Sequence, residues 1–344
     1  MDSNLISEIK EIFENEIKIL EIEIFKVCGV EFNIASPKQL GEVLFERLIL
    51  ESNPKKTKTG QYSTSEDTLS KLAKKHEIVK LILEWRSLQK LLTTYIYNLP
   101  KQIDSNSNKI HTEFNQTLTT TGRLSSINPN LQNIPIRTER GKLIRKSFIP
   151  SGKDYTLLCA DYSQIELRII AFLSGDSNMK NAFLNNEDIH TSTAARVFNI
   201  SIDEVNEEQR RNAKIVNFGI IYGVSAFGLS NQTNLTRSES KEIIDNYFKS
   251  YPKLKEYMSN QISFAREKGY VETILKRKRY LPEINSRNAI LRSSAERNAI
   301  NTPVQGSAAD IIKLAMIKIL SLIHISEPTR PERSGYAVVG LKKK

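Results

Sequence analysis

The sequence is poor in cysteine, histidine and tryptophan, with 2, 4 and 1 of them in 344 residues. Cys28 and Cys159 are far apart and have no metal-ligand spacing, which excludes a disulfide framework and indicates reduced thiols in a cytosol. No apolar run approaches the roughly 20 residues that span a bilayer. The acidic, amphipathic first residues do not resemble a signal peptide. We therefore expect a cytoplasmic protein with no membrane partner.

Acidic side chains are outnumbered by basic ones. The chain has 39 Asp and Glu against 50 Lys and Arg, which gives a net charge of +11. Lys and Arg near phosphates release condensed counterions on binding, so this excess favours a polyanionic partner such as a nucleic acid. A basic protein without such a partner has the same composition, and the charge alone leaves both possibilities open.

Helical periodicity dominates, and strand patterns are short, so the predicted class is α+β and mostly helical. Ser36 and Pro37 suit the N-cap and the first position of a helix. Helices are predicted over residues 4–26, 67–76 and 77–97, through most of 163–265, and as a final pair over about 286–319. Strands are predicted for EFNI (31–34), the apolar run YTLLCA (155–160) and a hairpin in VETILKRKRYLP (271–282).

Asp161 follows the apolar run 155–160 directly. A carboxylate at the end of a buried strand is held rigidly at a cleft, which suits Mg²⁺ coordination. A simpler interpretation is also open, in which Ser163 and Glu166 form a capping box and Asp161 favours the helix N-terminus. The spacing alone favours the cap.

A second segment, QRRNAKIVNFGIIYG (209–223), carries two cations and two rings at four-residue spacing. They are Arg210, Lys214, Phe218 and Tyr222. Residues so spaced share one stripe of a helix, and this stripe fits a helix that binds a polyphosphate at one end and packs against bases at the other. Gly219 and Gly223 weaken a helix, which indicates a need for close approach at these positions. Chance spacing on an ordinary amphipathic helix is the alternative.

These segments resemble the motifs of family A (bacterial DNA polymerase I-like) DNA polymerases. DYSQIELR (161–168) resembles the first motif, and RRNAKIVNFGIIYG resembles the second. The similarity continues in the family's order and covers about residues 1–319. Its further segments are SPKQLGEVLFERL, KKTKTGQYSTS, TGRLSS, NPNLQNIPIR, DIHTSTAARVF and AERNAINTPVQGSAADIIK.

The resemblance implies a right-hand polymerase fold with an incomplete palm. The implied domains are a thumb (1–105), the first part of the palm (106–170), fingers (171–285) and a truncated second part of the palm (286–319). It also implies a monomeric, nucleoid-associated bacterial enzyme of DNA replication and repair. Such an enzyme transfers dNTPs to the 3′-hydroxyl of a primer on template DNA with two Mg²⁺ ions.

The resemblance also assigns roles to residues. Asp161 would bind both ions, and the backbone carbonyl of Tyr162 would bind one. Glu166 would fill the space that a ribose 2′-hydroxyl needs. The implied nucleotide-binding residues are Arg210, Lys214, Phe218, Tyr222, Glu166, His190 and Gln164, with Lys214 also catalytic.

Other residues would contact the DNA. Those that resemble the minor-groove contacts at the primer end are Arg123, Arg297, Asn301 and Gln305, the last three on one helix face. Minor-groove acceptors lie at nearly the same places in every Watson–Crick pair, so such contacts test pair shape. Lys55, Lys56 and Lys58 are expected to touch backbone phosphates, although a solvated loop has the same composition.

The sequence departs from the family in three places. Lys276 stands where relatives often have a turn glycine, and the nuclease domains that usually precede this core are expected to be missing. Most important, the family's second metal-binding aspartate, in a Val-His-Asp-Glu hairpin, has no counterpart, because no aspartate follows Asp310. His324 comes too soon after Gln305 to mark that hairpin, and Glu327 is expected to be a plain tail residue.

Residues 320–344 are expected to be a non-native tail. LSLIHISEPTR is similar to the conceptual translation of a sequencing-library adapter. Since Mg²⁺ needs one or two carboxylates plus substrate phosphates, Asp161 alone leaves the site incomplete, and we expect an inactive, poorly folding fragment. A non-catalytic DNA-binding protein derived from a polymerase core is the alternative. A single-subunit RNA polymerase is disfavoured by Glu166.

Overall fold

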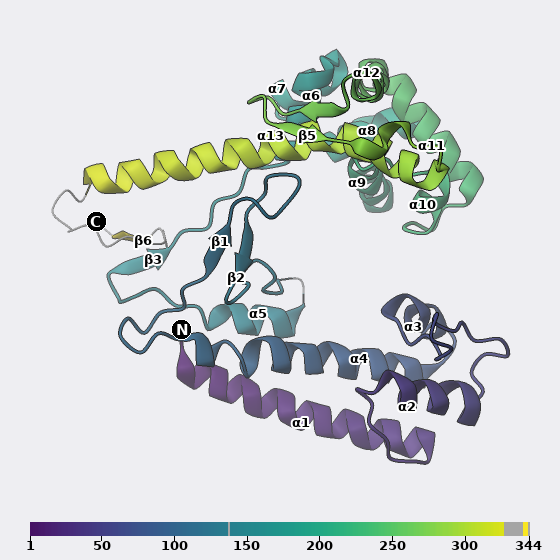
Figure 1. Cartoon of the computed structure of the whole chain (residues 1–344), viewed down its shortest axis with the longest axis vertical. Coiled ribbons are helices and arrows are strands. Elements are labelled where there is room, and N and C mark those ends of the chain that lie inside the picture. The colour runs from purple at the N-terminus through teal and green to yellow at the C-terminus, as the bar shows by residue number, and fades with distance from the viewer. Residues whose placement is uncertain (137, 327–339, 343–344) are drawn as a thin grey trace. The chain divides into compact units, whose positions relative to one another are not determined.

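The computed structural model describes residues 1–136, 138–326 and 340–342, which form two compact units (Figure 1). Unit 1 contains Met1–Phe114 and Ser126–Leu158, together with strand β6 (Gly340–Lys342). Unit 2 contains Asn115–Ser125 and the chain from Cys159 through helix α13 (Ala289–Ser326). The thumb, palm and finger boundaries remain predictions.

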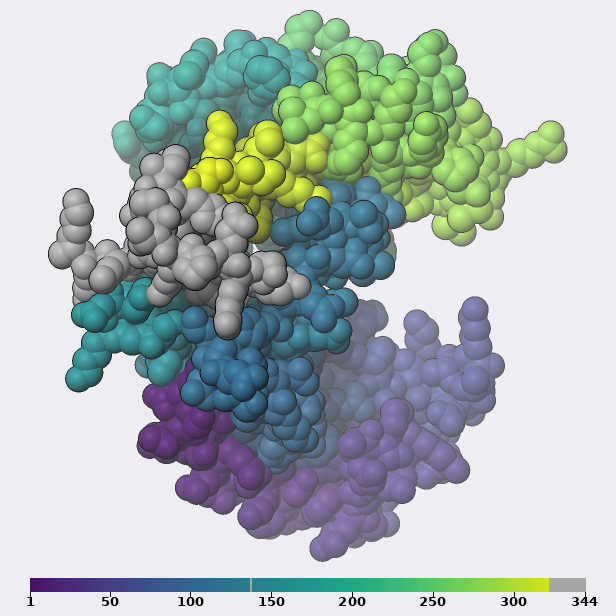
Figure 2. Space-filling model, turned by 60° about the vertical axis from the view of Figure 1, so that its left-hand side comes forward, coloured from purple at the N-terminus to yellow at the C-terminus, as the bar shows by residue number. Residues whose placement is uncertain are grey.

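Unit 1 is built on two long helices, α1 (Ser3–Cys28) and α4 (Glu77–Leu91). The predicted amphipathic helix is confirmed in α1, whose apolar residues Phe13 and Ile24 are fully buried. Its other helical segments are α2 (Pro37–Glu42), π-helical turns at Val43–Arg47 and Leu92–Ile96, α3 (Glu66–Leu72), a 3₁₀ turn at Pro100–Gln102 and α5 (Glu139–Lys146). Figure 2 shows the purple and violet N-terminal residues of this unit packed into one continuous surface.

Unit 2 is a cluster of shorter helices around a second core. Its helical segments are α6 (Ile165–Ser174), α7 (Ser177–Leu184), α8 (Ile189–Phe198), a 3₁₀ turn at Ile202–Glu204, α9 (Glu207–Ile221), α10 (Ala226–Ser230), α11 (Arg237–Ser250), α12 (Pro252–Lys268), a 3₁₀ turn at Pro282–Asn285 and α13. Tyr247 and Tyr251 are the largest fully buried side chains of this core, where they pack with Ile170 and Ile221. This core fixes α6, α8 and α9 relative to one another.

Strands are few and form two-stranded pairs in the described part of the chain. The pairs are β1 (Glu113–Asn115) with β2 (Ser125–Ile127), β3 (Tyr155–Leu157) with β6, and β4 (Tyr270–Glu272) with β5 (Lys278–Tyr280). The β4–β5 pair is antiparallel with Tyr270 opposite Tyr280, which confirms the predicted hairpin.

Two strand predictions are wrong. EFNI (31–34) is not a strand, because the Asn33 side chain accepts from the backbone N–H of Ala35 and starts a turn. The run 155–160 is a strand only over Tyr155–Leu157, and it is not buried: Leu157 and Leu158 are 44% and 56% exposed. Its one strand partner in the described chain is β6.

The predicted final pair of helices is also wrong, because α13 runs unbroken through Pro303. Proline removes the backbone N–H that would bond the carbonyl four residues earlier. Its neighbours are buried, with Ala299, Thr302 and Val304 all at 0% exposure, so tertiary packing holds the helix across this gap. Within the described chain, no helix combines the length and apolarity needed to cross a membrane.

Candidate functional site

Helix α9 presents the predicted stripe of cations and rings. A capping box starts it, since Asn206 Oδ1 accepts from Gln209 N at 2.9 Å and Gln209 Oε1 accepts from Asn206 N at 3.0 Å. The helix ends at Ile221, so Tyr222 is its C-cap. Lys214 is exposed and has no ion-pair partner in the described part of the chain. The free ammonium group suits an anionic ligand.

Arg210 lies beside the start of α8. Its Nη2 and Nε donate to Asp188 Oδ2 at 2.5 and 3.2 Å. Asp188 caps α8 by accepting from the backbone N–H groups of His190 and Thr191 at 2.8 and 3.1 Å. Burial opposes ionisation of Asp188, but the bonds from Arg210 and the backbone prevail and lower the pKa of its carboxyl. The ion pair therefore fixes the Arg210 guanidinium next to His190.

His190 is buried between α8 and α9, with 3% of its surface exposed. Its Nδ1 lies 3.1 Å from Asn217 Nδ2, and its ring centroid lies 5.8 Å from that of Phe218. Burial is the main cause that lowers the pKa of His190 to about 4; Asp188 opposes this shift, and the positive charges of Arg210 and Lys214 contribute to it. The imidazole is therefore neutral near pH 7.

Glu166 is buried on α6 and has two partners. It accepts from the Tyr222 hydroxyl at 2.6 Å, and it forms an ion pair with Arg123 Nη2. Burial and this bond raise the pKa of Tyr222 to about 12, which keeps the hydroxyl protonated. Glu166, Tyr222 and Arg123 thus belong to one neighbourhood, and Phe218 lies one turn before Tyr222 on the same stretch of chain.

The capping-box interpretation of Ser163 and Glu166 is wrong. Helix α6 begins at Ile165, and its N-cap is Gln164, which makes no capping bond. Gln164 has φ +54, a left-handed backbone conformation that residues other than glycine rarely adopt. The Glu166 carboxylate is directed to Tyr222 and Arg123, so the helix start cannot use it.

Both glycines of this segment are closely approached, Gly223 by a distant helix and Gly219 by a residue of the following turn. Gly223 has φ +69, and a Cβ there would lie 2.7 Å from Arg297 Cγ on α13. A Cβ on Gly219 would lie 2.7 Å from Val224 Cγ1. Gln305 and Asn301 follow Arg297 along α13, and Asn301 Oδ1 is buried without a hydrogen-bond partner in the described chain. An unpartnered acceptor of this kind is costly unless a ligand or water satisfies it.

Asp161 and Tyr162 are exposed and follow an irregular segment, four residues or more beyond the end of β3. No hydrogen bond or ion pair joins Asp161 to the stripe among the described residues. The described chain also contains no group of three or more His, Cys, Asp or Glu side chains that could hold a metal. This donor set does not fit two Mg²⁺ ions, and the two-ion site remains a prediction.

The three lysines predicted to contact phosphates are exposed in a loop of unit 1. Lys56 forms an isolated bridge with Tyr62, and its Nζ lies 4.9 Å from the Tyr62 ring centroid. Lys55 and Lys58 are solvated. Their role remains a prediction, and Glu327 lies outside the described residues.

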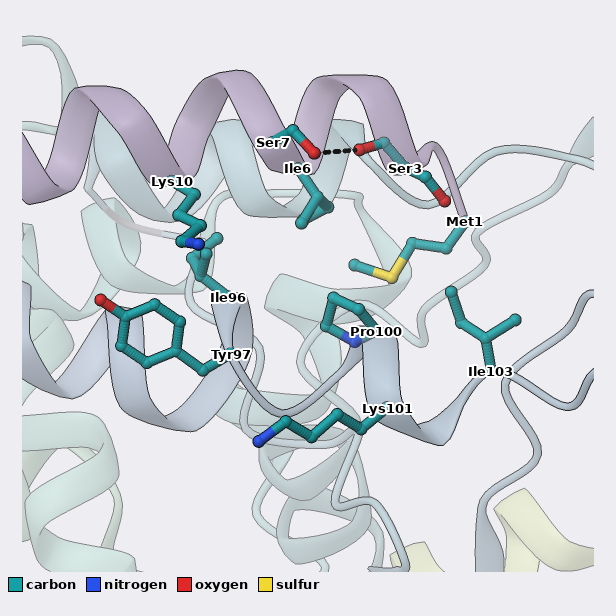
Figure 3. Close-up of a pocket in the computed structure, with 10 residues that line it drawn as sticks. All are labelled: Met1, Ser3, Ile6, Ser7, Lys10, Ile96, Tyr97, Pro100, Lys101 and Ile103. Carbon is teal, nitrogen blue, oxygen red and sulfur yellow. Dashed lines mark hydrogen bonds between the residues drawn. The ribbon is translucent and has the colours of Figure 1, made fainter.

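Unit 1 also contains a cavity of about 520 Å³ between α1 and the end of the α4 segment (Figure 3). Ile6, Ile96 and Pro100 give it apolar walls, and Lys10 and Tyr97 lie side by side at one end. No predicted site residue lines it. The cavity therefore does not belong to the stripe.

Sequence reasoning missed Arg277, which lies in the turn of the β4–β5 hairpin. Its guanidinium bonds Asp310, Thr121 and Gly306. In the sequence it stands in the basic run KRKR, which is typical of a solvated turn. Gly122 and Gly306 lie against the guanidinium, and they were the sequence features that indicated close packing at this place.

The fold is mostly helical α+β, and α9 carries two cations and two rings, of which Tyr222 bonds the buried Glu166. The chain belongs to DNA polymerase family A, whose sequence profile matches residues 3–330. That match extends past residue 320, so the predicted start of a non-native tail remains a prediction.

Bacterial relatives and a solved structure agree with this assignment. DNA polymerase I of Geobacillus stearothermophilus is 55% identical over 304 residues, covering 88% of this chain and 34% of that protein. DNA polymerase I of Bacillus caldotenax is 53% identical over 320 residues, covering 93% and 36%. The POL domain of Pol1 from M. smegmatis, in complex with DNA primer-template and dNTP, has a TM-score of 0.85 and 42% identity, covering 95% of this chain and 57% of that one. The chain thus spans about a third of its curated relatives.

Proposed function

We propose that this chain is the polymerase core of a template-directed DNA polymerase, which adds dNTPs to a primer 3′-hydroxyl. The observation that carries the proposal is the neighbourhood around α9, where the stripe meets Glu166 and His190. Its partners would be primer–template DNA and dNTPs. We also propose a monomer that works in the bacterial cytoplasm at the nucleoid.

The α9 stripe would bind the nucleotide along its length. Lys214, which is exposed, and Arg210, which Asp188 orients, would contact the triphosphate. His190 is neutral and therefore available as a hydrogen-bond donor that adds no charge. Phe218 would pack against the nucleotide, and Tyr222 would lie beside the templating pair. Gln164, at the start of α6, would contact the nucleotide or the minor groove.

Glu166 would select the sugar. Its buried carboxylate is held from two sides, by the Tyr222 hydroxyl and by Arg123. A side chain so constrained cannot move aside for a ribose 2′-hydroxyl without losing both partners. This supports its role in excluding ribonucleotides, which also argues against an RNA polymerase.

Four side chains would contact the minor groove of the primer end. They are Arg123, Arg297, Asn301 and Gln305. Asn301 Oδ1 is buried and unpartnered in the described chain, as expected for a group that awaits a ligand. Lys55, Lys56 and Lys58 would contact backbone phosphates of the DNA.

We infer that residues 1–344 bind these substrates without joining them. Asp161 and the Tyr162 carbonyl would be the protein ligands of a divalent ion, and no aspartate follows Asp310. Because this donor set is too small for two Mg²⁺ ions, no transfer step is assigned to this chain. The same observation favours the second candidate function, a non-catalytic DNA-binding protein that keeps the polymerase pocket.

Replacing Lys214 tests the nucleotide pocket. We expect Lys214→Ala to weaken dNTP binding to the chain–DNA complex about tenfold or more, because a charge-assisted phosphate contact is lost. Primer–template affinity should change less than about twofold. Equilibrium titration with labelled DNA and then dNTP measures both. Lys249→Ala, on the exposed face of α11, is the matched control. Unchanged dNTP affinity in Lys214→Ala would refute the assignment.

A further inference from the structure

Arg277 joins three segments of unit 2 that are far apart in the sequence. Its Nε donates to Asp310 Oδ1 at 3.0 Å, and its Nη2 donates to the carbonyls of Thr121 at 2.8 Å and Gly306 at 3.1 Å. Thr121 precedes Arg277 by 156 residues. One guanidinium thus ties the segment before Arg123 to the hairpin and to α13. The Asp310 carboxylate that receives it is buried.

Two glycines make room for this guanidinium. A Cβ on Gly122 would lie 2.5 Å from Arg277 Cζ, and Gly122 has φ +80. A Cβ on Gly306 would lie 2.8 Å from Arg277 Nη2. Neither position accepts a side chain while Arg277 is in place. The hairpin is anchored to α13 a second time, since Ile274 N donates to Ser307 Oγ at 2.9 Å.

Each carbonyl that Arg277 bonds lies next to a predicted minor-groove residue. Thr121 is two residues before Arg123, and Gly306 directly follows Gln305. We propose that Arg277 is a positioning residue that sets the separation of Arg123 and Gln305, and with it the contact to the terminal base pair of the primer. This inference rests on the proposed function. Because minor-groove acceptors occupy nearly constant places, two donors at a fixed separation distinguish a correct pair from a distorted one.

The test removes one minor-groove atom of the DNA and measures the change in primer–template affinity, so it does not depend on polymerase activity. Primer–template affinity of the full chain is measured with guanine or 3-deazaguanine at the primer terminus, since the latter lacks the minor-groove N3 acceptor. The wild-type chain should lose about five- to tenfold in affinity on this substitution. Arg277→Lys keeps the charge but not the planar guanidinium, so the loss of primer–template affinity caused by 3-deazaguanine should be less than about twofold in this variant.

Two further variants complete the experiment. Arg279→Lys changes the neighbouring strand arginine, whose Nη1 donates to Thr302 Oγ1 at 2.8 Å, and should respond to 3-deazaguanine as the wild type does. Asp310→Asn removes the negative charge that accepts from Arg277 Nε, so its affinity for primer–template should respond less to 3-deazaguanine than that of the wild type. This variant replaces Arg277→Lys in the experiment if Arg277→Lys shows no thermal transition.

The outcomes separate the two claims. If 3-deazaguanine does not change the primer–template affinity of the wild-type chain, the proposed minor-groove contact is overturned, and the role of Arg277 with it. A responsive wild type, together with folded Arg277→Lys or Asp310→Asn variants that respond equally, overturns the role of Arg277 alone. A merely structural role would lower the melting temperature and leave the response to the DNA atom unchanged.

Discussion

Glu166 has a buried carboxylate with two protein partners, and its proposed role in sugar selection can be separated from those contacts. We expect Glu166→Ala to reduce the preference of the chain–DNA complex for dATP over ATP by about tenfold or more, because space for the 2′-hydroxyl opens. Competition titration measures the preference. Tyr222→Phe removes the hydroxyl that bonds Glu166 at 2.6 Å and should reduce the preference less than Glu166→Ala does, because Arg123 still holds the carboxylate. A preserved preference in Glu166→Ala contradicts the assignment.

His190 should make stability depend on pH. Its pKa falls from 6.5 to about 4 on folding, mainly through burial. Above about pH 6.5 the ring is neutral in both states and contributes nothing. As the pH falls towards 4, only the unfolded chain takes up the proton, so the free energy of unfolding decreases by roughly 1–3 kcal/mol.

Urea unfolding of wild type and His190→Gln at about pH 7 and pH 4.5 measures this contribution. Carboxylates titrate in both proteins, so the comparison isolates the histidine. The wild type should lose more stability than the variant between the two pH values. Equal losses would mean that the folded chain accommodates the imidazolium.

Among the elements, the β4–β5 hairpin contains a strained turn. Lys276 has φ +63, in the left-handed region that favours glycine. Lys276→Gly should raise the free energy of unfolding by about 1 kcal/mol, because glycine adopts this conformation without steric cost. The ion pair with Glu272 at 3.3 Å is exposed on the lysine side, and its loss offsets less than this.

Thermal denaturation checks the prediction. Lys278→Gly, in strand β5 of the same hairpin, should have the opposite sign, since it removes a side chain that packs over the Tyr270 ring at 4.4 Å. A destabilised Lys276→Gly would show that the lysine side chain outweighs the backbone strain.

Elements set by local chemistry could be predicted from the sequence, and those set by distant packing could not. Ser36 caps α2 as expected, with Oγ accepting from Gln39 N at 3.4 Å. A pair of helices was expected over about 286–319, but buried neighbours of Pro303 keep α13 continuous. In the site, four-residue spacing and glycines identified the stripe. The contacts of Arg277 could not be predicted, because its partners include a carbonyl 156 residues away, which no local sequence pattern reveals.

At the scale of the whole molecule, apolar surface remains uncovered. The last part of α13 exposes a run of apolar side chains: Ile312, Leu314, Met316, Ile317, Ile319 and Leu320. β3 also exposes Leu157. Exposed apolar helix and strand surfaces favour aggregation, and the poor folding of this chain stays a prediction.

Primer extension by a completed chain tests the central claim most directly. Residues 320–344 are replaced by the corresponding C-terminal segment of DNA polymerase I from Geobacillus stearothermophilus, and incorporation of dNTPs is followed on a primer–template. We expect no extension by residues 1–344, extension by the completed chain, and loss of extension in its Asp161→Ala variant. A completed chain that folds and binds primer–template DNA but does not extend it would contradict the account.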